Sequence, residues 1–225
     1  MGGVKKEYRI LPGTDGTVLN RTVSAFAAQP CISRIIITVP DKPHIGEAAA
    51  RQALAPGLFA GEQPHISFVS GGSTRRASVL NALLALAAYK PSYVLIHDGC
   101  RPWVSGRLIQ EIIDAVQEHG AVIPMLPLID TPKEINHPFN QGPGLPVITR
   151  DLCRSLTGLA QTPQAFEYAG ILAAHETAQR EDTGLCIYTD DAQVWGEFCG
   201  PVAVVPGEAE NRKITFPGDL EAMRC

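Results

Sequence analysis

Two adjacent glycines, Gly71 and Gly72, follow an apolar run at 65–69 and precede Arg75 and Ser78. Paired glycines let backbone N–H groups approach a ligand closely, and an arginine beside a helix N-terminus favours negative charge. The segment therefore indicates a binding loop for an anion. A simple glycine turn followed by a Ser or Thr helix cap explains the same residues, so both interpretations stay open here.

An acid and a base, Asp98 and Arg101, follow the next apolar run at 93–96. In a doubly wound sheet, ligands gather where the strands end, which makes this position a candidate site. Asp98 has the chemistry to hold Mg²⁺ or a sugar hydroxyl, and the Arg101 guanidinium can bind phosphate through a pair of hydrogen bonds. A capped loop with a surface ion pair is the competing interpretation. His97 and Cys100, in the same segment, receive no role from the pattern.

Lysines and arginines outside these two loops supply further candidate ligands for an anion. Lys213 lies in the charged segment 210–215, after the apolar run 202–205. A phosphate would suit it as a partner, although charged loop residues are usually only solvated. The same reservation applies to the remaining basic candidates, which are Lys5, Lys6, Arg150 and Arg154.

The elements that must position these residues alternate between strands and helices. Short apolar runs that stop at glycine, proline or a charged residue predict buried strands at 35–39, 65–69, 93–96, 121–125 and 202–205. Apolar residues at helical spacing predict helices over 18–26, 79–86 and 108–116. This alternation predicts an α/β fold with a doubly wound, mostly parallel, Rossmann-like sheet.

The segment 126–157 interrupts the alternation. It contains five prolines and two glycines, which are too many breaks for a helix. It is also too long for an ordinary connection between elements. We expect an extended arm, a β-hairpin that reaches out of a single domain spanning 1–225, and arms of this kind often embrace a second subunit.

Composition excludes several classes of protein. The chain has 225 residues, 45% hydrophobic content and a net charge of −4, which suits one α/β domain. The acidic balance argues against nonspecific nucleic-acid binding, and no apolar run is long enough to cross a membrane. The amino terminus lacks the apolar core of a secretory signal, so we expect a cytoplasmic protein. The six scattered cysteines form no Cys-x-x-Cys pair and are expected to be reduced thiols.

Six short patterns occur in a compatible order and spacing along the chain. They are Gly71-Gly72-x-x-Arg75-x-x-Ser78, His97-Asp98-x-x-Arg101-Pro102, Asp130-Thr131-x-Lys133, Gln161-Thr162-Pro163-Gln164-x-Phe166, Thr189-Asp190-Asp191 and Asn211-x-Lys213-Ile214-Thr215. Each is common alone, but the set is hard to attribute to composition. Together they resemble the 2-C-methyl-D-erythritol 4-phosphate cytidylyltransferase family, from about Lys5 to the carboxyl terminus.

The resemblance implies a reaction of the non-mevalonate route of isoprenoid biosynthesis. Members of the family transfer CMP from CTP to methylerythritol phosphate, release pyrophosphate and use Mg²⁺. The acceptor phosphate attacks the α-phosphorus in line, so catalysis consists mainly of positioning and charge neutralisation. A cytidylyltransferase for another polyol phosphate, such as ribitol 5-phosphate, is a close alternative. A nucleotide-binding module without catalysis is a more distant one.

The resemblance also implies roles for particular residues. Lys6, Lys213 and Arg154 match catalytic positions, while Gly71, Gly72, Arg75 and Ser78 match the nucleotide loop. Asp98, Arg101, Thr131, Thr162 and Thr189 match positions that contact substrate, and Asp98 is also the candidate metal ligand. Thr131 and Arg154 belong to the arm, which in the family crosses to a partner subunit. A homodimer is therefore expected, with each active site built from two chains.

The chain departs from the family pattern at its beginning. Family members open with an apolar strand and a glycine-rich, arginine-bearing loop around the triphosphate, and Met1 stands where that loop has already ended. Loss of the loop would weaken CTP binding, and loss of the strand would leave its neighbours with unpaired edges. We expect the native protein to begin upstream of Met1. A truncated relative without catalysis is the alternative.

Overall fold

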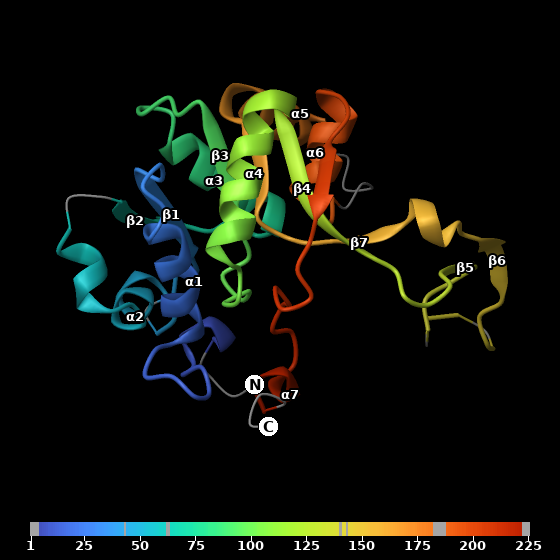
Figure 1. Cartoon of the computed structure of the whole chain (residues 1–225), viewed down its shortest axis with the longest axis horizontal. Coiled ribbons are helices and arrows are strands. Elements are labelled where there is room, and N and C mark those ends of the chain that lie inside the picture. Colours follow the sequence, from blue (N-terminus) through green and yellow to red (C-terminus); the bar gives the residue numbers. More distant parts are fainter. Residues whose placement is uncertain are drawn as a thin grey trace.

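The computed structural model describes residues 5–42, 44–61, 64–139, 141–142, 144–181 and 188–221. Helices and strands form an α/β body, from which one hairpin reaches away on a long pair of connections (Figure 1). The predicted fold class is therefore confirmed. Each of the five predicted strands is present, with its ends within two residues of the expected positions.

The strands of the body form two sheets in the described part of the chain. In the first, β1 (Arg34–Val39) pairs in parallel with β2 (His65–Ser70). In the second, the order is β3 (Tyr93–Ile96), β8 (Gln164–Glu167), β4 (Ala121–Pro127) and β7 (Gly158–Ala160), and β9 (Ala203–Pro206) also pairs with β4. Since β8 is antiparallel to both β3 and β4, and β4 is parallel to β9, the strands β3, β4 and β9 point the same way. The antiparallel β8 was not predicted.

Within the described residues, β1 pairs only with β2 and β3 pairs only with β8, so each of these strands has one unpaired edge. The isoleucines of β1 are only half-buried, although three of them in a row predicted a strand covered on both faces.

The helices begin and end where the local chemistry of the chain allows. The α-helices are α1 (Val18–Ala27), α2 (Glu47–Gln52), α3 (Arg75–Ala85), α4 (Gly106–His119), α5 (Tyr168–Arg180), α6 (Asp191–Phe198) and α7 (Pro217–Glu221). Short 3₁₀ helices are η1 (Lys6–Tyr8), η2 (Pro56–Phe59) and η3 (Arg154–Leu156). Side chains of Thr17, Thr74, Ser105 and Asp190 accept N–H groups at the starts of α1, α3, α4 and α6. Helix α4 ends at Gly120, whose φ of 74° lies in the left-handed region that glycine tolerates.

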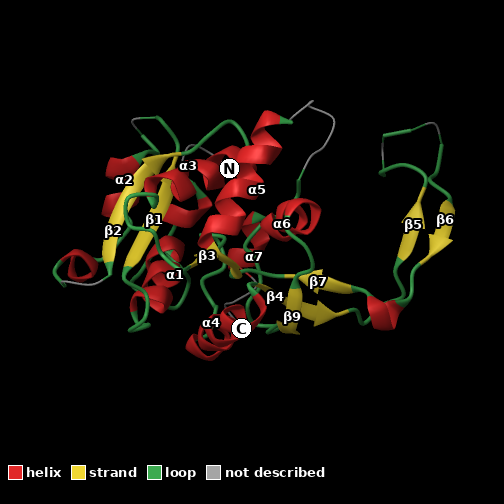
Figure 2. Cartoon of the chain, turned by 90° about the horizontal axis from the view of Figure 1, so that it is seen from above, coloured by secondary structure: helices red, strands yellow, loops and turns green. Residues whose placement is uncertain are grey.

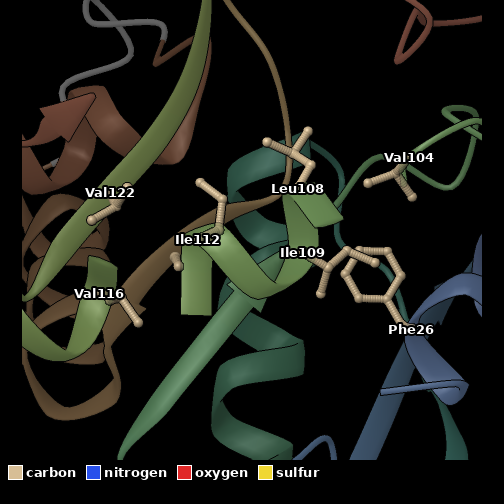
Figure 3. Packing of buried hydrophobic residues seen from close by; sticks show 8 residues of the cluster. Phe26, Val104, Leu108, Ile109, Ile112, Val116 and Val122 are labelled. Carbon is tan, nitrogen blue, oxygen red and sulfur yellow. The ribbon is translucent and has the colours of Figure 1, made fainter. Parts of the chain in front are cut away.

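The largest core cluster lies between α4, α1 and the sheet. Leu108, Ile109 and Ile112 of α4 are fully buried and contact the cluster that also contains Phe26 of α1 and Val122 of β4 (Figure 3). Fully burying one such side chain contributes about 1.5 to 3 kcal/mol. This core fixes α4 and the end of β3, and with them the loop that carries Asp98.

The arm consists of β5 (Lys133–Ile135) and β6 (Ile148–Asp151), which pair antiparallel. It stands apart from the body in both views (Figure 2). Ion pairs Lys133–Asp151 and Glu134–Arg150 join its two strands. The β-hairpin predicted within 126–157 is therefore present.

Two further expectations concern the whole chain. None of the described helices is long and apolar enough to cross a membrane. Cys31, Cys100, Cys153 and Cys199 are free thiols, as expected. The other two cysteines, Cys186 and Cys225, lie outside the described residues.

Candidate functional site

The Gly71–Gly72 loop connects the end of β2 to the start of α3. The Gly71 N–H donates to the Val39 carbonyl at 2.7 Å, and the Gly72 N–H donates to Ser78 Oγ at 3.0 Å. A Cβ at Gly72 would lie 2.4 Å from Ala77 Cβ, so only glycine fits there without moving the backbone. The loop is thus both a capped glycine turn, through Thr74, and a rigid presentation of backbone next to Arg75.

Asp98 lies at the centre of a cationic cluster. Its Oδ2 atom is 3.2 Å from Arg101 Nε and 3.1 Å from Lys213 Nζ. Burial alone would raise the pKa of Asp98, but Lys213, together with Arg101 and Arg75, holds that pKa below its usual value. Asp98 is therefore a carboxylate at neutral pH, and two cations at its side are held in place by it.

Lys6 reaches the same cluster from the amino-terminal end of the chain. Its Nζ donates to the Ile214 carbonyl at 2.7 Å, next to Lys213. The Ile214 N–H in turn donates to the Cys100 carbonyl at 2.9 Å, which ties the segment to the Asp98 loop. Lys6, Asp98 and Lys213 therefore lie together although more than 200 positions separate the two lysines.

Arg75 links the glycine loop to this cluster. Its Nη2 is 2.7 Å from Asp191 Oδ2, and the other carboxylate oxygen of Asp191 is 3.2 Å from His175 Nε2. Burial would lower the pKa of Arg75, but Asp191, and more weakly Asp98, raise it above its ordinary value. Asp191 is buried at the start of α6. Its ion pair therefore fixes the Arg75 guanidinium, which also interacts electrostatically with Asp98.

Thr189 lies immediately before α6, in the turn that holds Asp191. Its N–H and hydroxyl both face Gln193 Oε1, at 3.1 and 3.4 Å. The buried Gln164 closes this turn, because its side chain donates to Asp190 Oδ2 and accepts the Asp191 N–H. Thr189 is thereby placed two residues from the anchor of Arg75.

His97 and Thr162 form a hydrogen-bonded pair beneath the Asp98 loop. Thr162 Oγ1 lies 3.0 Å from His97 Nδ1 and accepts the Asp98 N–H at 3.1 Å. His97 Nε2 lies 3.2 Å from the Arg101 carbonyl. Burial lowers the pKa of His97 to about 4, so the imidazole is neutral at pH 7.

The two remaining predicted residues, Thr131 and Arg154, lie on the arm and its connections. Arg154 Nη1 donates to the Ile129 carbonyl at 2.8 Å. An open cavity of about 880 Å³ adjoins Arg154, lined among others by Met125, Ile129, Leu156 and Val204. Because the arm extends away from the body (Figure 1), the chain does not bring these two residues to its own Asp98 cluster.

The structure brings together Lys6, Arg75, Asp98, Arg101 and Lys213, which were all predicted from the sequence. Four further residues of this region received no role there, namely His97, Gln164, His175 and Asp191. What distinguishes these residues is that they are polar and buried at the ends of strands and helices. The sequence alone does not show burial, so it gave no signal for them. Among the described residues, no group of three or more His, Cys, Asp or Glu side chains could hold a metal ion by itself.

An α/β body with a glycine loop and neighbouring cations has the Rossmann-like fold of the nucleotidyltransferase class. The chain belongs to the 2-C-methyl-D-erythritol 4-phosphate cytidylyltransferase family, whose sequence pattern it matches over residues 1–224. It is 40% identical over 222 residues to the bifunctional enzyme IspD/IspF of Rhodospirillum rubrum, covering 98% of the chain and 51% of that relative. With the bifunctional enzyme IspD/IspF of Bradyrhizobium sp. strain ORS 278 it shares 39% identity over 220 residues, covering 97% and 50%. The chain spans about half the length of the curated relatives it matches.

Solved structures agree with this assignment. The 2-C-methyl-D-erythritol 4-phosphate cytidylyltransferase of Thermus thermophilus has 33% identity and a TM-score of 0.70, covering 96% of this chain and 91% of that one. The 4-diphosphocytidyl-2C-methyl-D-erythritol synthase of Anaerococcus prevotii has 26% identity and a TM-score of 0.78, covering 98% and 90%.

Proposed function

We propose that this chain transfers CMP from CTP to 2-C-methyl-D-erythritol 4-phosphate and releases pyrophosphate. The observation that carries the proposal is the convergence of Arg75, Arg101 and Lys213 on Asp98, with Lys6 bound to the Ile214 carbonyl next to Lys213. Such a group of cations suits a substrate with several phosphates and a second, phosphorylated substrate. Family membership supports cytidine as the base and methylerythritol phosphate as the acceptor.

The reaction requires charge neutralisation more than covalent chemistry. An oxygen of the acceptor phosphate forms a bond to the α-phosphorus of CTP, the bond from that phosphorus to the bridging oxygen breaks, and pyrophosphate leaves with the electron pair. Lys6 and Lys213 lie where they can offset charge on the oxygens of the triphosphate. Positioned cations can do this without reorganising during the reaction, since Lys6 is held by the Ile214 carbonyl and Lys213 by Asp98.

The nucleotide and the acceptor would meet different parts of this site. Gly71, Gly72 and Ser78 present backbone and a hydroxyl at the start of α3, where a nucleoside could be held. Asp98 and Thr189 are the candidates for contact with the acceptor, together with Arg101.

Mg²⁺ is a proposed cofactor, and the chemistry of Asp98 fits it. Arg101 and Lys213 both contact Oδ2 of Asp98, so Oδ1 is the oxygen proposed to bind the metal. Mg²⁺ is commonly held by one or two carboxylates together with substrate phosphates, so a single carboxylate such as Asp98 suffices. When bound there, Mg²⁺ would neutralise charge on the phosphate oxygens.

A homodimer through the arm is also proposed. Ile129 and Leu156 are 87% and 84% exposed, and both line the cavity beside Arg154. Large apolar side chains exposed on a protruding segment are typical of a surface that a partner covers. A second copy would bring its Thr131 and Arg154 towards the Asp98 cluster of the first. We further propose a cytoplasmic location, because CTP is an intracellular nucleotide.

The test is a coupled assay of pyrophosphate release from CTP and Mg²⁺ with each acceptor, using the full-length protein from its own cells. Release with methylerythritol phosphate, and little with ribitol 5-phosphate, is the expected result. Release of pyrophosphate with ribitol 5-phosphate alone would show that ribitol 5-phosphate, and not methylerythritol phosphate, is the acceptor. Heat stabilisation by CTP without any release would refute the enzyme and favour a binding module.

A further inference from the structure

We propose that His97 and Thr162 are positioning residues that fix the loop of Asp98 and Arg101 for catalysis. The inference rests on the proposed function, because it assigns these two side chains a part in the same site. Neither contacts the cations directly, and each acts through the backbone of the loop.

The Arg101 carbonyl determines the tautomer of His97. A carbonyl oxygen only accepts hydrogen bonds, so His97 Nε2, at 3.2 Å from it, must carry the ring proton. The neutral ring then has an unprotonated Nδ1, which can only accept. The Thr162 hydroxyl, 3.0 Å away, therefore donates its proton to His97.

The direction of that bond leaves the Thr162 oxygen free to accept, and the Asp98 N–H donates to it at 3.1 Å. The result is one directed chain from the Asp98 N–H through Thr162 and His97 to the Arg101 carbonyl. It joins the two ends of a turn that is itself closed by the Arg101 N–H on the Asp98 carbonyl at 3.0 Å. Both functional side chains project from this doubly closed turn.

The two positioning residues are themselves fixed. The Thr162 carbonyl accepts from Asn211 Nδ2 at 2.8 Å, and the Asn211 carbonyl accepts from Arg101 Nη1 at 2.8 Å. The His97 ring packs on Phe26 with centroids 4.8 Å apart. Thr162 is only 5% exposed, and its hydroxyl already donates and accepts within the protein. We therefore assign this hydroxyl to holding the loop, in place of the substrate contact expected from the sequence.

Four variants separate the parts of the chain of hydrogen bonds. Thr162→Val keeps the shape and removes the hydroxyl, whereas Thr162→Ser keeps the hydroxyl and serves as the conservative rescue. His97→Asn keeps a polar group near Nδ1, and His97→Gln keeps one near Nε2. Tyr168→Phe is the matched control, because it removes a buried hydroxyl bond to the Leu83 carbonyl, remote from the Asp98 loop.

The kinetic result must separate positioning from simple loss of folded protein. We expect Thr162→Val to lower kcat/KM for the acceptor by about ten- to a hundredfold, with a raised acceptor KM. Its KM for CTP should change less than about twofold, and Thr162→Ser should recover most of the loss. Tyr168→Phe should lower thermal stability and leave both KM values unchanged. A Thr162→Val enzyme with normal KM values and a reduced active fraction would overturn the proposal.

Nuclear magnetic resonance tests the same network without relying on activity. Long-range ¹⁵N–¹H spectra of the full chain should show His97 as the Nε2–H tautomer, and Thr162→Val should speed amide exchange at Asp98 by about tenfold or more. An Nδ1–H tautomer, or unchanged exchange at Asp98, would refute the positioning role. If the wild-type protein released no pyrophosphate while both spectroscopic results held, the proposed function alone would fail.

Discussion

Acidification from pH 7 to pH 5 should destabilise the chain through His97. In the folded state burial lowers the pKa of His97 to about 4, whereas the unfolded chain has the ordinary value of 6.5. Between these values the unfolded state binds a proton that the folded state does not, so stability falls as the pH falls. The contribution is complete above about pH 6.5 and is lost by about pH 4.

The magnitude follows from the gap between the two pKa values. A lowering from 6.5 to about 4 corresponds to a total of roughly 3 kcal/mol at 1.36 kcal/mol per unit. At pH 5 the unfolded histidine is almost fully protonated, so about 2 kcal/mol of this should already be lost. Asp98 and Arg101 are the charged groups that face the ring.

Urea unfolding at pH 7 and pH 5 measures the effect, with His97→Phe as the reference. Phenylalanine keeps a ring against Phe26 but cannot bind a proton, and the other titrating groups are common to both proteins. The wild type should lose about 2 kcal/mol more than the variant between the two pH values. If the two proteins lost the same free energy within about 0.5 kcal/mol, the reasoning from burial would be refuted.

Three other substitutions test the site. Asp191→Asn should lower the free energy of unfolding by about 2 to 3 kcal/mol, because it leaves the partly buried Arg75 without its charged partner; a loss below about 0.5 kcal/mol in urea unfolding would contradict the anchor. Lys213→Ala should change the free energy of unfolding by less than about 1 kcal/mol, since the lysine side chain is 42% exposed, but it should lower turnover about a hundredfold. A fall in pyrophosphate release that is matched by an equal loss of folded protein in calorimetry would count against its role. Gly72→Ala should lower the free energy of unfolding by about 1 to 3 kcal/mol, because the new Cβ meets Ala77, and it should weaken CTP binding in calorimetric titration. Its control, Gly196→Ala, adds a Cβ in open space on α6, and similar effects of both would refute the steric argument.

The placement of the strands and helices could be predicted largely from local pattern. The isoleucine run of β1 and the helical spacing of Leu108 and Ile112 are properties of neighbouring residues, so short windows of sequence carry them. The strand β8 escaped prediction because Gln164 at its start is polar and yet buried. A buried glutamine is stable there only because it closes the turn before α6, which no local window can reveal.

The candidate site divides in the same way. Residue types and order within six short patterns indicated Asp98, Lys213 and the glycine loop as candidates, because ligand chemistry restricts which side chains can serve, and the family resemblance added Lys6. The sequence could not predict that Asp191 anchors Arg75 or that His97 and Thr162 hold the Asp98 loop. Those roles depend on distances between distant segments and on burial, which determines protonation and direction in hydrogen bonds. The sequence therefore determines which chemical groups are available, whereas the tertiary structure determines the partner of each polar group.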